Sequence, residues 1–160
     1  MDDVVSWDVH LQKFDQGAVV NFDLELAERV LRRTRGFCEA EPGVGEIVEG
    51  GFAEIYYGSK PSSDVMVSIR ASSATVLQLI YDLAAELRMV VFFPTEESWG
   101  AIVVEQSQTR DLPDPSWSGW EAFDEGFTPP TPIVCRNADE LAAALVPAYD
   151  GWETWAHGRR

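Results

Sequence analysis

The sequence predicts an α+β fold in which helices cover one face of a mostly antiparallel sheet. Residues 5–12 alternate apolar and polar side chains, which is the pattern of a half-buried strand. Residues 72–87 place apolar side chains at helical spacing, and the apolar run 89–93 follows at once as a buried strand. Several further strand patterns follow one another without an intervening helix, which is typical of an α+β chain.

The second element is expected to be a helix that Asn21 or Asp23 caps and that ends near Arg35. Gly36 follows as a stop signal. Basic side chains at the C-terminal end complement the helix dipole, and the alternative interpretation is an anion site. The apolar side consists of Phe22, Leu26, Ala27, Val30 and Leu31, and the basic cluster of Arg29, Arg32, Arg33 and Arg35.

Residues 38–51 contain a proline, several glycines and four glutamates, so we expect a loop, with a short strand at 47–48 as an option. Residues 52–57 and 65–70 then form two strands joined by a polar loop. The expected core positions of this strand pair are Ile55, Tyr57, Val67 and Ile69.

The central helix begins after Ser72 or Ser73, either of which can act as its N-cap. Beyond the strand that follows, a second strand over residues 100–105 returns across the turn 95–99. The resulting order is strand, helix, strand, strand, helix, strand, strand. This order is the split βαβ or ferredoxin-like pattern, a two-layer sandwich, with one added hairpin strand.

At 160 residues with 46% hydrophobic content, the chain is long enough to bury one core, so we expect a single domain. Its core is expected over residues 4–106 and a C-terminal extension over 107–160. The first half of the extension holds most of the prolines and several aromatic rings, so it is expected to wrap around the core. Asn137 and Glu140 then predict a capped helix over residues 138–145.

The formal net charge of −15 comes from 27 acidic and 12 basic side chains. Such a surface repels phosphates, so we expect no direct nucleic-acid binding and favour a cationic partner. The alternative is that acidity only keeps the protein soluble. No apolar run could span a bilayer and the N-terminus is acidic, so we expect a cytoplasmic protein without membrane association. Cys38 and Cys135 have no motif spacing and are expected to be free thiols.

No motif for catalysis, a metal or a cofactor is present, so we expect a non-enzymatic protein without a cofactor. His10 and His157 lack metal-ligand spacing, and there is no GxSxG nucleophile motif. The glycines of residues 43–51 do not form a phosphate loop, and the glutamates among them oppose phosphate. The carboxylates lie in turns and polar loops, whereas a general acid or base needs an apolar recess.

A recognition surface is the remaining candidate. The turn 95–99 places two acids and an indole at a hairpin tip, and DLPDPSWSGWEAFDEGF repeats this combination. Tryptophan is enriched at interface hot spots, and neighbouring acids steer a cationic partner. In the alternative interpretation, the indoles cover the core and the acids face solvent. The candidate partner-binding residues are Glu96, Glu97, Trp99, Asp114, Trp117, Trp120 and Glu121.

Three stretches resemble small immunity proteins of bacterial polymorphic-toxin systems: VVSWDVHLQKF, VLQLIYDLAAELRMVVFFPT and ADELAAALVPAYDGWETW. The resemblance implies a small, acidic, cytoplasmic α+β protein that performs no catalysis and occludes the active site of a cognate toxin. From the acidic charge we expect that toxin to be an enzyme of nuclease or NAD-consuming type with a cationic cleft. Two other functions remain open. One is a structural or adaptor subunit that self-associates, and the other is a small-molecule-binding protein with an enclosed pocket.

Overall fold

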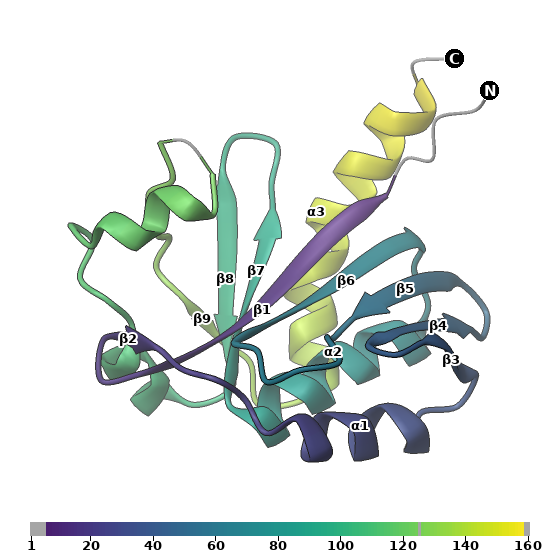
Figure 1. The fold of residues 1–160 in the computed structure, drawn as a ribbon. Helices are drawn as coiled ribbons and strands as arrows, with labels where there is room; N and C mark the ends of the chain where they lie inside the picture. The colour runs from purple at the N-terminus through teal and green to yellow at the C-terminus, as the bar shows by residue number, and fades with distance from the viewer. Residues whose placement is uncertain (1–5, 125, 159–160) are drawn as a thin grey trace.

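The computed structural model describes residues 6–124 and 126–158, and it confirms the predicted α+β class with a mostly antiparallel sheet (Figure 1). The described residues form one open sheet in the order β3-β4-β5-β6-β1-β7-β8-β9, with β2 paired to β1. All pairs are antiparallel except β8 with β9. The strands are β1 (Trp7–Asp15), β2 (Ala18–Val19), β3 (Phe37–Glu41), β4 (Val44–Val48), β5 (Phe52–Tyr56), β6 (Asp64–Ala71), β7 (Met89–Pro94), β8 (Trp99–Val103) and β9 (Ile133–Val134).

Strand β1 lies in the middle of the sheet and separates two environments. Trp7, Val9 and Leu11 are buried in the core that faces the helices, as their alternation predicts. The intervening His10 and Gln12 project from the other face. Val5, expected to belong to the same apolar row, lies outside the described residues.

The helices α1 (Leu24–Arg33), α2 (Ala74–Leu87) and α3 (Ala138–Gly158) cover one face of the sheet. In Figure 1 they lie below and behind the strands, with α2 between the other two. Asp23 caps α1 through Leu26 N–H, and Ser73 caps α2 through Val76 N–H, so both predicted starts are confirmed. At the other end of α2, the Nζ of Lys13 donates to the carbonyl of Leu87 at 2.7 Å.

The expectation of a loop over residues 38–51 is wrong, because most of this segment belongs to the hairpin of β3 and β4. The turn consists of Pro42 and Gly43, and Gly43 has a φ of 81°. Proline followed by a glycine with positive φ suits a tight turn, and Ile47 provides the inward anchor of β4. The loop was predicted because of the glycines and glutamates in this segment. The Pro-Gly pair was nevertheless a usable signal for a tight turn.

The segment between β8 and β9 covers part of the opposite sheet face (Figure 1). It contains two short 3₁₀ helices, Gln106–Asp111 and Ser118–Ala122. Its rings pack on strands β1, β7 and β8 and form a second core, whereas the same face of β4, β5 and β6 lies outside this core. The buried members of this second core are Phe14, Val90, Phe92, Ala101, Val103, Trp120 and Phe127.

Helix α3 extends far beyond the predicted end at residue 145 and continues through Pro147. Proline removes one helical hydrogen bond, but Pro147 lies on the exposed side of the helix, where the carbonyl left without a partner can bind water. The continued helix is held to the sheet by Tyr149, whose ring contacts Trp7 and whose hydroxyl accepts a bond from Ser72 N–H. The predicted cap is formed by Asn137, which accepts from Glu140 N–H.

Candidate functional site

The turn between β7 and β8 places two carboxylates beside an indole. The strands pair up to Pro94 and Trp99. Thr95 closes the turn, because its backbone N–H donates to Ser98 O and its hydroxyl accepts from Ser98 N–H, both at 3.0 Å. Glu96 and Glu97 are exposed at the tip, whereas Trp99 is partly buried. We call residues 95–99 the hairpin tip.

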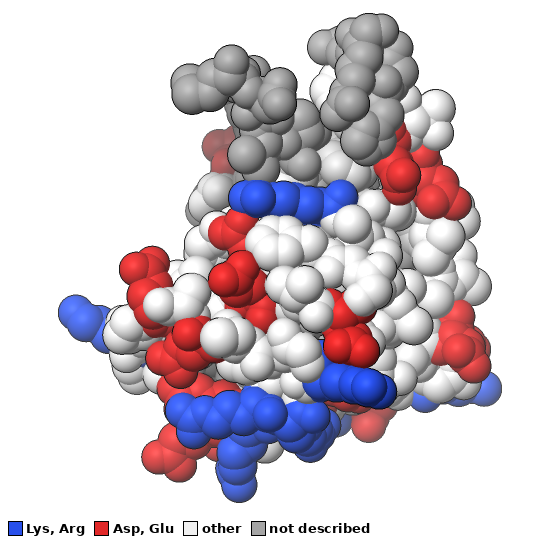
Figure 2. All heavy atoms as spheres, turned by 90° about the vertical axis from the view of Figure 1, so that its right-hand side faces the viewer, with Lys and Arg blue, Asp and Glu red and all other residues white. Residues whose placement is uncertain are grey.

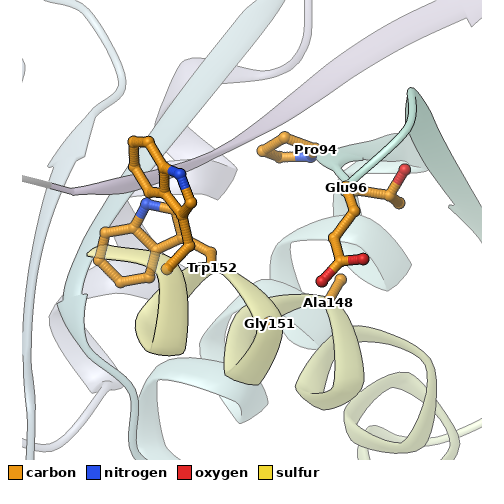
Figure 3. Close-up of a pocket in the computed structure, with 7 residues that line it drawn as sticks. Pro94, Glu96, Ala148, Gly151 and Trp152 are labelled. Atoms are coloured by element: carbon orange, nitrogen blue, oxygen red, sulfur yellow. The ribbon is translucent and has the colours of Figure 1, made fainter. Parts of the chain in front are cut away.

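A hollow of about 420 Å³ separates the hairpin tip from the C-terminal half of α3 (Figure 3). Glu96 lies on one side of this hollow and Trp152 on the other. Gly151 allows the carboxylate to come close, because a Cβ there would lie 3.2 Å from Glu96 Oε1. The remaining lining residues are Pro94, Thr95, Ala148 and Trp155. The α3 side of this hollow was not predicted, because the expected helix ends at residue 145. The spacing of Trp152 and Trp155 was a signal that the helix continues.

A second hollow, of about 320 Å³, lies between the hairpin tip and a wall formed by Asp124, Gly126, Phe127 and Thr128. Trp99 forms its boundary: the indole Nε1 donates to Asp124 Oδ2 at 3.4 Å, and the ring packs on Phe127 at 5.8 Å between centroids. Asp124 therefore joins Glu96 and Glu97 as a third acid around this hollow. It lies in the acidic, aromatic stretch that the sequence singled out, but it was not among the predicted site residues.

We call the segment between β8 and β9 the wrapping segment. A third hollow, which we call the His10 recess, lies where the wrapping segment meets strands β1 and β6, and it has a volume of about 430 Å³. The His10 ring lies 5.9 Å from the ring of Trp99. Burial lowers the pKa of His10, although the nearby Asp8 and Asp64 act in the opposite direction. The imidazole is therefore held in its neutral form at neutral pH.

Trp120 is a core residue and not a contact residue, so its assignment to the partner-binding surface is corrected. Its side chain is 2% exposed, and its Nε1 donates to the carbonyl of Asp114 at 2.9 Å. The Trp120 ring packs among Phe14, Phe92 and other residues of the second core, and it anchors the wrapping segment there. This is the alternative interpretation that the sequence analysis kept open.

The other predicted residues of the wrapping segment have different surroundings. Trp117 is partly buried and lines the His10 recess. Asp114 accepts hydrogen bonds from the backbone and hydroxyl of Ser116, which lower its pKa and stabilise a local turn. Glu121 is exposed. Neither Asp114 nor Glu121 lines any of the three hollows, so the structure separates them from the hairpin tip.

The three hollows are lined by no Lys or Arg within the described part of the chain. Arginines form ion pairs elsewhere, and the acids of the hairpin tip and Asp124 take part in none of the ion pairs between described residues. On the face in Figure 2, acids are scattered among uncharged residues, and many cationic side chains gather at the lower edge, at the level of α1 in Figure 1. Acids are thus widespread, but those at the hairpin tip form no ion pair within the part of the chain that the structure describes.

The described residues contain neither a metal-binding cluster nor a membrane-spanning helix. No three His, Cys, Asp or Glu side chains among them are arranged to hold a metal ion. None of their helices combines the length and apolar character needed to cross a membrane. Cys38 is exposed and Cys135 buried, and both are free. The fold and its surface thus define an α+β protein with an acidic, ring-lined hairpin tip.

The chain matches no protein-family model, and no curated protein or solved structure is significantly similar to it.

Proposed function

We propose that the protein is a non-enzymatic, cytoplasmic immunity protein that binds a cognate bacterial toxin enzyme and occludes its active site. The observation that carries the proposal is the hairpin tip, where Glu96 and Glu97 are exposed without a cationic partner among the described residues. Indoles lie on both sides of these acids, in hollows that can receive side chains of a partner. The resemblance in the sequence points to the same class of function.

The proposed mechanism is competition for a cationic cleft. A nuclease or an NAD-consuming enzyme binds phosphates through Lys and Arg, and exposed carboxylates on a protruding turn can take the place of those phosphates. Trp99 and Trp152 then provide the apolar contact area that acids alone do not supply. In this mechanism, the acids determine the association rate and the rings slow dissociation.

For the fold, we propose a split βαβ, ferredoxin-like core with additions at both sheet edges. The proposal is supported by the neighbouring strands β5-β6-β1-β7, all antiparallel, and by the helices α1 and α2 that follow β1 and β6 in the chain. The hairpin β3–β4 then extends one edge, and β8 with β9 extends the other.

The test uses the purified protein and the purified toxin encoded by a gene adjacent to its own. We expect the protein to abolish the toxin's enzymatic activity at an equimolar ratio, and to form a stable complex with it in gel filtration. Full toxin activity in the presence of excess protein contradicts the proposal. Self-association that grows with concentration, without inhibition, favours the structural or adaptor function instead.

A further inference from the structure

We propose that the His10 recess binds the guanidinium group of an arginine side chain that the protein partner presents. This inference rests on the proposed function for the source of the arginine, and it assigns a specific contact that the hairpin tip alone does not define. The residues that carry it are His10, Gln12, Asp64, Trp99, Trp117 and Phe123, all of which line the recess.

The floor of the recess is built by two central strands. Gln12 of β1 and Asp64 of β6 lie directly opposite each other in the antiparallel pairing, and His10 is the next residue of β1 on the same face. Rings from the covering side face this polar floor: Trp99 comes from β8, and Trp117 and Phe123 come from the wrapping segment. The recess thus combines hydrogen-bonding groups on one side with flat apolar surfaces on the other.

The polar groups of the recess offer acceptors. Gln12 is only 6% exposed, and its Nε2 donates to the carbonyl of Ser63 at 2.8 Å. Its Oε1 receives no hydrogen bond from any described residue, so this amide oxygen can accept from a ligand that enters the recess. Asp64 Oδ1 accepts from the hydroxyl of Ser62 at 3.1 Å, and its second oxygen has no such donor among the described residues.

His10 adds a further acceptor, because a neutral imidazole accepts at one of its two ring nitrogens. Neither nitrogen has a hydrogen-bond partner among the described residues, where the ring's recorded contact is with Trp99. The recess therefore offers several acceptors, one of them a carboxylate, and its lining contains no cationic side chain among the described residues. Such a recess favours a ligand that carries positive charge and several hydrogen-bond donors.

The rings decide between the two cationic side chains. A guanidinium is flat, stacks on indoles and presents five N–H donors in a fixed plane, whereas an ammonium is compact and more strongly hydrated. The indoles of Trp99 and Trp117 therefore favour arginine. The recess is also reachable from outside, since Asp64 is exposed and Val19 in its lining is 38% exposed.

The test is an NMR titration of the full chain with N-acetyl-arginine-N-methylamide, which presents the side chain on a peptide-like backbone. We expect the indole N–H signals of Trp99 and Trp117 and the ring signals of His10 to shift in one saturable process. The citrulline analogue, which has nearly the same shape without the charge, is expected to bind at least about tenfold more weakly, since charged hydrogen bonds are the stronger ones.

Two variants test the role of the carboxylate. Asp64→Asn is expected to weaken arginine binding about tenfold, whereas Glu121→Gln, which removes an exposed acid outside the recess, leaves it unchanged. Equal affinity for the citrulline analogue, or no effect of Asp64→Asn, overturns the proposal. Agmatine binding at least tenfold more tightly than the capped arginine also overturns it, because the recess then takes a free guanidino metabolite.

The result of the arginine titration can be distinguished from the result of the toxin-inhibition assay. The titration contains no toxin, so its failure removes the arginine site while the inhibition assay stands. Conversely, if the toxin is not inhibited but capped arginine binds with the expected selectivity, the recess holds and its partner is a different protein.

Discussion

At the scale of single residues, His10 shows how the fold changes the chemistry of a side chain. Two carboxylates, Asp8 and Asp64, lie close enough to favour the protonated imidazole, yet burial beside Trp99 has the larger effect and lowers the pKa. A neutral imidazole in the middle of a very acidic protein is consistent with the recess being an acceptor site.

This shift predicts how stability depends on pH. The pKa of His10 is lower in the folded protein than its ordinary value of 6.5, so below pH 6.5 the unfolded chain binds more protons. The free energy of unfolding is therefore expected to keep the full His10 contribution above pH 6.5 and to lose it as the pH falls through 6.5 toward the folded pKa. Urea denaturation between pH 7.5 and about 4.5 measures this.

The matched variant is His10→Gln, compared with the original protein at each pH. Both proteins keep His157 and every carboxylate, so subtracting the two curves leaves the contribution of position 10. A difference in unfolding free energy that stays constant over the whole range contradicts the assignment.

Two glycines in hairpin turns make a controlled comparison. Gly43 and Gly17 have φ values of 81° and 79°, but a Cβ at Gly43 would clash with the backbone of Gly58, whereas none of the described atoms crowds a Cβ at Gly17. Gly17→Ala is expected to cost about 1 to 2 kcal/mol, which is the conformational penalty alone. Gly43→Ala is expected to lower the free energy of unfolding by more than this, because of the added clash with Gly58. Equal unfolding free energies for the two variants would contradict the close approach of Gly43 to Gly58.

At the scale of elements, the wrapping segment has little regular structure and depends on its rings. Trp120 stacks on Phe127 and contacts Phe14 of β1, so it joins the segment to the sheet. The segment also carries Trp117 and Asp124, which line the hollows, so the anchor residue and the surface residues belong to one element.

Trp120→Ala is expected to lower the free energy of unfolding by about 3 to 5 kcal/mol, because it leaves a large cavity in the second core. Trp117→Ala, at a partly buried ring of the same segment, is expected to cost less. Denaturation gives both values, and limited proteolysis of the Trp120 variant should cut first between residues 106 and 132. Equal losses for the two variants would show that Trp120 is not the anchor.

Sequence patterns predicted those elements whose signals are local. The alternation around Val9 and the cap at Ser73 depend on neighbours in the chain, and both are as predicted. The floor of the His10 recess could not be predicted, because Gln12 and Asp64 meet only through pairing of distant strands. The burial of Trp120 likewise depends on which sheet face the wrapping segment covers, and local composition does not encode that choice.

At the scale of the whole molecule, negative charge is widespread, but only some of the acids are paired with arginines. The net charge is −15, and arginines pair with acids at α1, at β5 and β6, and at the end of α2. The hairpin tip has no ion pair among the described residues. Long-range attraction to a cationic partner is expected to come from the whole surface, whereas the docking geometry comes from the tip.

The most direct test of this account is growth of cells that co-express the adjacent toxin with one of three forms of the protein. The double variant Glu96→Lys and Glu97→Lys reverses charge at the hairpin tip, and Glu39→Lys with Glu41→Lys makes the same change at exposed positions of β3. We expect the original protein and the β3 variant to protect the cells, and the tip variant to fail. Full protection by the tip variant, or equal loss with both variants, contradicts the account.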